Sequence, residues 1–149
     1  MSVLIEKMRA ARQRNIDIND HHYTIRRPTP MEAMEWLSSA GNTKPTWMAE
    51  PFSLKSKGWR DAAWYAVNHF VDGWDVNEID LIPGGVSVPV PFSVELLGEW
   101  LLDRPDILSQ LTIRILDLWI DYNNQQVDDE KKPETGSEPV AAQSSATTN

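Results

Sequence analysis

The stretch that organises this chain runs from Gly58 to Leu108 and reads GWRDAAWYAVNHFVDGWDVNEIDLIPGGVSVPVPFSVELLGEWLLDRPDIL. Apolar residues repeat at spacings of three and four at both ends of it, which predicts helices over about residues 58–72 and 93–103. The connector between them holds a Pro-Gly-Gly turn and further prolines, which no long helix tolerates. Four of the seven tryptophans lie in this stretch, so we place the centre of the fold here.

Downstream of this stretch, Asp103-Arg104-Pro105 ends one helix and begins another, predicted over about residues 105–125. Upstream, Thr29-Pro30-Met31-Glu32 has the residues of a capping box with proline at the first helical position, which predicts a helix over about residues 29–40. We expect its apolar stripe to be Met31, Met34 and Leu37, with Ala33 and Trp36 beside it.

Residues 15–27, NIDINDHHYTIRR, switch to an alternation of apolar and polar residues. Asn19 and Asp20 separate the two alternating runs and tolerate turn conformations, so we expect a β-hairpin. No other segment gives a convincing strand signal. A two-stranded hairpin is marginal alone in water, so we expect it to pack on helices.

The expected fold is therefore mainly α (α+β): a single helical domain over residues 1–126 with one small hairpin near the N-terminus. Ser2 can cap a further, first helix. Residues 127–149 contain no aromatic residue and are rich in acidic and small residues, so we expect a disordered acidic tail.

The composition narrows the class of function. The chain has 149 residues, a formal net charge of −8 and no cysteine. Negative charge opposes binding to nucleic acid, and the lack of cysteine excludes thiolate chemistry, cysteine-bound zinc and disulfides. The N-terminus lacks the pattern of a signal peptide, and no apolar run approaches the ~20 residues that span a bilayer. We expect a cytoplasmic protein without a membrane segment.

No catalytic, cofactor-binding or metal-binding pattern is present. His21 and His22 are adjacent in a predicted strand, where neighbouring side chains point to opposite faces, so surface histidines are favoured over a metal pair. We expect a protein that is not an enzyme; only a fold that gathered His22, His69 and Asp72 in one cleft would reopen that question.

The aromatic residues are the candidates for a binding surface. Trp59, Trp100 and Trp119 lie on apolar stripes and are expected in the core. The predicted partner contacts lie off those stripes or in loops, and they are Trp47, Trp64, Tyr65 and Trp74. For the loop of residues 41–57 two interpretations stay open: its apolar residues fix the loop to the core, or they bind a partner.

Three segments carry a resemblance to a known family. The capped helix with its preceding strand, YTIRRPTPMEAMEWL, and the later segments VDGWDVNEIDL and VPVPFSVELLGEWLLDRPDIL resemble the tail assembly chaperones of long-tailed (siphovirus-like) phages and prophages. In that pattern a Gly-Trp turn is followed by Pro-Phe at one helix start and Asp-Arg-Pro at the next. The likeness covers roughly residues 15–122 and rests on structural motifs.

The resemblance implies a chaperone in the cytoplasm of the bacterial host cell. Such proteins bind and solubilise the tape measure protein, help recruit the tail tube protein, and are absent from the mature virion. Members often make a longer product by ribosomal frameshifting, and codons for Glu130-Lys131-Lys132 can form a slippery A-rich run or simply encode a charged tail. The alternative is a small structural virion protein, such as a tail or head–tail completion component.

Overall fold

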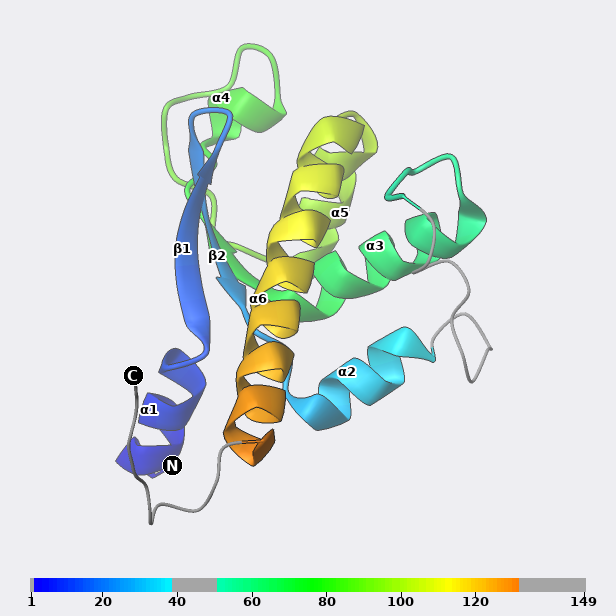
Figure 1. Cartoon of the computed structure of the whole chain (residues 1–149). Helices are drawn as coiled ribbons and strands as arrows, with labels where there is room; N and C mark the ends of the chain where they lie inside the picture. Colours follow the sequence, from blue (N-terminus) through cyan, green and yellow to red (C-terminus); the bar gives the residue numbers. More distant parts are fainter. Residues whose placement is uncertain (1, 39–50, 132–149) are drawn as a thin grey trace, which may run out of the picture. The chain divides into compact units, whose positions relative to one another are not determined.

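The computed structural model describes residues 2–38 and 51–131, and in this part the chain is mainly helical with one small sheet (Figure 1). The elements in chain order are α1 (Val3–Ala10), β1 (Gln13–Ile18), β2 (His21–Arg26), α2 (Pro30–Leu37), α3 (Lys57–Phe70), β3 (Val71–Trp74), α4 (Glu78–Leu81), α5 (Val94–Leu102) and α6 (Pro105–Lys131). The predicted fold class, mainly α with a small N-terminal hairpin, is confirmed.

The chain divides into two compact units, Met1–Trp119 and Ile120–Asn149. The fold that follows is that of the first unit. The described part of the second unit is the C-terminal section of α6, which is helical as far as Lys131. The helix therefore continues beyond the predicted end near residue 125, and the predicted disorder does not begin at residue 127. Residues 132–149 of the predicted tail lie outside the described residues.

The predicted hairpin is present, with β1 and β2 paired antiparallel from Gln13 opposite Arg26 to Ile18 opposite His21. Asn19 and Asp20 form its turn with φ angles of 48° and 69°, which asparagine and aspartate adopt more readily than most residues. The alternation predicted the buried face correctly, because the inward side chains are those of Ile16, Ile18, Tyr23 and Ile25.

The structure adds a third strand that the sequence did not predict. β3 pairs antiparallel with β2, with Tyr23 opposite Trp74, so the sheet order is β1-β2-β3. The helix predicted over residues 58–72 therefore ends at Phe70, and Val71 begins the strand. A third strand satisfies backbone groups along β2 that a lone hairpin would leave to water, which explains how so short a sheet is stable.

The capping box predicted for α2 is confirmed. The Thr29 hydroxyl accepts a hydrogen bond from the Glu32 N–H, and the Glu32 carboxylate accepts one from the Thr29 N–H. The predicted apolar stripe is wrong, however, because Met31 and Met34 are 70% and 66% exposed. Ala33 and Trp36 face the core instead, and the Trp36 indole N–H donates to the Ala62 carbonyl of α3.

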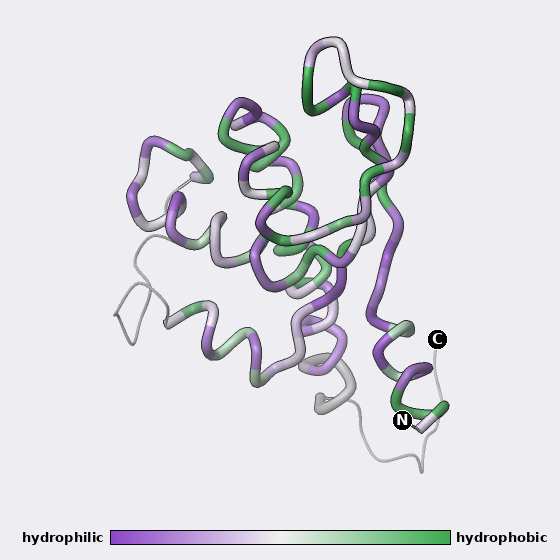
Figure 2. The backbone as a smooth tube through the Cα atoms, turned by 180° about the vertical axis from the view of Figure 1, so that it is seen from behind, coloured by the Kyte–Doolittle hydropathy of each residue, from purple (hydrophilic) through white to green (hydrophobic). Residues whose placement is uncertain are grey.

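One hydrophobic core joins the inner face of the sheet to helices α2, α3, α5 and α6, and both figures show α3 and α5 on the same side of the sheet (Figures 1 and 2). Trp59 and Trp100 are buried as expected, whereas Trp119 is half-buried. The Trp100 indole N–H donates to the Tyr23 hydroxyl, at 3.1 Å, which links α5 to β2. The Arg104 guanidinium lies 3.5 Å from the centre of the Trp100 ring.

The connector between β3 and α5 is ordered by backbone hydrogen bonds. Val76 is fully buried, and Asn77 forms an isolated bridge with Pro89. Val86 and Val88, which alternate with polar residues in this connector, do not form a strand. They lie in an exposed loop that follows α4, and hydrophobic residues are visible along this loop at the top of Figure 2. The exposed apolar residues of this region are Ile79, Ile82, Val86 and Val88.

Candidate partner-binding site

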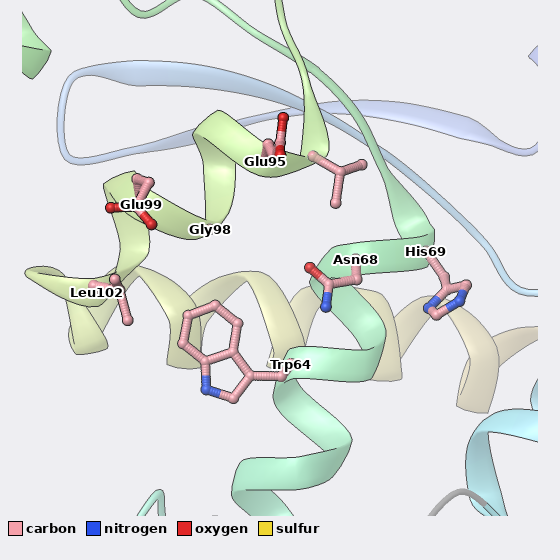
Figure 3. Close-up of a pocket in the computed structure, with 8 residues that line it drawn as sticks. Trp64, Asn68, His69, Glu95, Gly98, Glu99 and Leu102 are labelled. Atoms are coloured by element: carbon pink, nitrogen blue, oxygen red, sulfur yellow. The ribbon is translucent and has the colours of Figure 1, made fainter.

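An open hollow with mainly apolar walls lies between α3 and α5 and has a volume of about 670 Å³ (Figure 3). We call it the α3–α5 groove. Three of its lining residues come from α3 and five from α5. They are Trp64, Asn68 and His69 on α3, and Val94, Glu95, Gly98, Glu99 and Leu102 on α5.

The buried faces of the two helices determine which side chains reach the groove. α3 buries residues on the stripe of Ala63, Ala66 and Val67, so Trp64 and Asn68, four residues apart, lie together on its flank. α5 buries Leu97, Trp100 and Leu101, and the residues of its opposite side are left to form the groove wall.

On α5 the groove residues form two rows at i, i+4 spacing. One row is Val94, Gly98 and Leu102, in which two apolar side chains flank a position without a side chain. The other row is Glu95 and Glu99. Figure 3 shows the Trp64 indole extending from α3 toward Leu102. The groove thus has an apolar floor and an acidic rim.

Exposed apolar area and unpaired charge distinguish this groove from an ordinary helix junction. Val94 is 41% and Leu102 63% exposed, and Trp64 is half-buried. No ion pair is found for Glu95 or Glu99 within residues 2–38 and 51–126. A site with apolar area and unpaired carboxylates is suited to binding a partner that has both apolar and basic groups.

Of the predicted partner contacts, Trp64 alone lines the groove. Tyr65 is the next residue of α3, and its ring stacks on His69 at 4.1 Å between ring centres. Burial and the negative charges of Glu35 and Glu32 raise the pKa of the Tyr65 phenol. Tyr65 therefore lies on the side of α3 that faces the acidic residues of α2.

Trp74 has an internal structural role in this fold. Its indole N–H donates to the Val90 carbonyl at 2.8 Å, and its ring packs edge-on against Phe92 and Trp100. These contacts hold the connector against the core. They explain why a tryptophan is found at this position without invoking contact with another protein. Trp47 and most of the loop of residues 41–57 lie outside the described residues.

The groove residues of α5 were missed in the sequence. A signal was available, because this nine-residue helix has more apolar residues than one buried face needs. They are Val94, Leu96, Leu97, Trp100, Leu101 and Leu102. What periodicity alone does not reveal is which of them a neighbouring helix leaves uncovered. From the sequence alone, Gly98 is notable only because glycine has a low helix propensity.

His21 and His22 lie in a network of carboxylates. His21 lies 3.4 Å from Asp75 and 4.0 Å from Asp80, and its ring packs edge-on against Trp100, so it is half-buried instead of lying on the surface as expected. The hydrogen bond that the His22 ring donates to the Asp17 carboxylate, followed by the charges of Asp17 and Asp75, raises the pKa of His22. No group of three or more His, Asp or Glu side chains in the described chain is arranged to hold a metal ion.

A second, polar hollow of about 570 Å³ lies beside the end of the sheet. Arg26 crosses it, donating to both carboxylate oxygens of Glu32 and pairing with Asp72 at 3.5 Å. Its remaining lining residues are Arg9, Arg12, Gln13 and Thr29. Because Arg26 binds both Glu32 and Asp72, we interpret this hollow as part of the structural network that joins β2, α2 and β3.

Comparison with protein-family models, with curated proteins and with solved structures found no match to this chain. In the described part of the chain, no helix is both long enough and apolar enough to cross a membrane.

Proposed function

We propose that this protein is a tail assembly chaperone of the type made by long-tailed phages. In this proposal it binds the tape measure protein in the cytoplasm of the bacterial host, keeps it soluble, and helps to recruit tail tube subunits without entering the virion. The observation that carries the proposal is the open α3–α5 groove, in which Trp64 and Leu102 present apolar area to solvent.

A chaperone for a long helical client needs apolar area that a helix can cover reversibly. Large aromatic side chains beside a hollow are the usual anchors of such contacts, and a groove between two helices accepts a third helix. The net charge of −8 keeps the chaperone and its complex in solution while this area is exposed. The resemblance of residues 15–122 supplies the identity of the client.

The groove supports binding without chemistry. Its titratable side chains are Glu95, Glu99 and His69, and the His69 Nδ1 is already engaged with the Tyr65 carbonyl at 2.8 Å. Nucleophilic catalysis requires a nucleophile within hydrogen-bond reach of a base, and the groove lining contains no serine, threonine or cysteine. We therefore propose that the protein acts by binding alone.

Co-expression with the tape measure protein of the same phage tests the proposal. A tagged form of this chain should retain that protein in the soluble fraction, and it should be missing from purified particles. Trp64→Ala should reduce the amount retained, because truncating a central aromatic anchor costs on the order of 2 kcal/mol of binding. Ile82→Ala, at an exposed apolar position outside the groove, is the matched control.

The alternative predicts a different result. A structural virion protein would be found in purified particles and would not keep the tape measure protein soluble. That combination would replace the chaperone proposal with a tail or head–tail completion component.

A further inference from the structure

Resting on the proposed function, the geometry points to the chemical class of client segment that the α3–α5 groove takes. We propose that the groove binds an amphipathic α-helix that places a large apolar side chain at Gly98 and two basic residues, one turn apart, opposite Glu95 and Glu99. The groove therefore binds basic helices more tightly than neutral or acidic helices.

The space beside Gly98 is open. A Cβ built on this residue meets no heavy atom within 4 Å. Val94 and Leu102 lie one turn away on either side along the same row of α5, and Trp64 lines the opposite wall. The missing side chain thus leaves a hole with apolar sides, into which a leucine, methionine or phenylalanine of a third helix can insert as a knob.

The charges that line the groove on α5 are both negative. Glu95 and Glu99 are four residues apart on α5 and both exposed, so their carboxylates stand on one side of the hole. Glu95 lies in the first turn of α5, where the helix dipole favours an acid, but Glu99 lies beyond that turn. Like charges at this spacing repel one another along a helix, and a lysine or arginine pair on the client removes that repulsion.

The walls of the groove favour a helical occupant over an extended one. Both walls of the groove are α-helices, whose backbone N–H and C=O groups are already paired within the helix. An extended peptide would find no strand edge here to pair with, and its own backbone groups would lose water without compensation. A helix satisfies its backbone internally, so it is the form of chain that fits.

Labelled synthetic peptides of about 20 residues test this selection directly, because this length spans about 30 Å as a helix. One peptide carries a leucine and phenylalanine stripe flanked by lysines at i, i+4 spacing. Two others replace the lysines by glutamine or glutamate, and a fourth scrambles the order. Fluorescence anisotropy with the full-length protein should show the lysine peptide binding at least about tenfold tighter than the glutamate peptide, with the difference shrinking at high salt.

Two variants of the protein locate the effect in the groove. Gly98→Leu fills the hole and should abolish binding of every peptide, while Gln110→Leu adds the same side chain to an exposed helical position outside the groove and should change nothing. Glu95→Lys with Glu99→Lys should invert the preference toward the glutamate peptide. Glu6→Lys with Asp117→Lys makes the same change in net charge at exposed positions elsewhere and should leave the preference as it is. Circular dichroism confirms that each variant is folded.

The outcomes separate this inference from the proposed function. Equal binding of lysine and glutamate peptides, lost in Gly98→Leu, overturns the charge selection but leaves the groove as the client site. Retention of the tape measure protein without binding of any peptide overturns the groove as its site and leaves the chaperone function. Self-association of the wild type that Gly98→Leu abolishes would show that a second copy of this chain fills the groove, and would also overturn the inference.

Discussion

At the scale of single residues, glycine has opposite roles at two positions of this chain. Gly98 lies inside a helix with open space where its side chain would be, so the fold does not require a glycine there. At Gly85 a Cβ would lie 3.0 Å from both the carbonyl oxygen and the side-chain Cγ of Glu78, so the connector does require one. This contrast is what makes Gly98 a candidate for function.

Alanine substitutions should separate the two roles. Gly98→Ala should raise the free energy of unfolding by about 0.5–1 kcal/mol, because alanine loses less backbone entropy than glycine in a helix. Gly85→Ala should lower it, since the added methyl group meets backbone that has to shift. Urea denaturation of both variants measures the difference. Destabilisation by Gly98→Ala would contradict the open space that the structure shows.

The buried hydroxyl of Tyr23 gives a second prediction at this scale. Tyr23 is 1% exposed, burial raises the pKa of its phenol, and the hydroxyl accepts the Trp100 indole N–H. Tyr23→Phe leaves that N–H buried without its acceptor, which should cost about 1–3 kcal/mol of unfolding free energy. Tyr65→Phe removes a hydroxyl with no hydrogen bond in the described structure and should cost far less. Equal losses for the two variants would argue against the Tyr23–Trp100 bond.

At the scale of elements, local signals were read correctly and non-local ones were not. The capping box at Thr29 and the turn at Asn19-Asp20 were predictable because each depends on residues within four positions of one another. The strand Val71–Trp74 depends on pairing with β2, about fifty residues earlier, and its short length gave no period to detect. In α2, two sets of apolar residues have helical spacing, one with Met31 and Met34 and the other with Ala33 and Trp36. The set that contains the large Trp36 side chain is the buried one.

Arg26 and Glu32 join β2 to α2, and this junction predicts a dependence of stability on pH. Burial alone would raise the pKa of Glu32, but hydrogen bonds from the Thr29 N–H and from Arg26 outweigh it, so the pKa is lowered below 4.5. A carboxyl group with a depressed pKa in the folded state adds stability above its unfolded pKa and loses it as pH falls through the folded one.

The unfolding free energy of the wild type should therefore fall as pH drops below about 4.5, and Glu32→Gln should remove part of that fall. Chemical denaturation at several pH values between neutrality and strong acid measures both curves. Glu6→Gln, at an exposed position on α1, is the control and should keep the wild-type slope. A Glu32→Gln curve parallel to the wild type throughout would refute the role of this junction.

At the scale of the whole molecule, the class of fold was predictable, whereas the groove was not. The spacing of apolar residues at three and four predicted a predominantly helical chain, with Trp59 on the buried side of α3. The groove arises from how closely α3 approaches α5, which depends on every side chain of the core between them. The position of Trp64 beside the apolar stripe of α3 was therefore predictable from spacing. That Gly98 and Leu102 of α5 line the same groove was not predictable.

The division of the chain into two units yields the last prediction. Among the residues of α6 up to Gln126, the last fully buried side chain is that of Ile115, inside the unit Met1–Trp119. A chain that stops after Gln126 keeps all of them, together with the sheet and the α3–α5 groove. Its unfolding free energy should therefore stay within about 0.5 kcal/mol of the full-length value, as for changes away from a core. The peptide affinities should be unchanged as well. Denaturant titration and anisotropy on the shortened chain measure these quantities, with the full-length protein as control. A larger loss of stability would mean that the segment after Gln126 packs on the first unit, and a loss of affinity alone would mean that it forms part of the binding site.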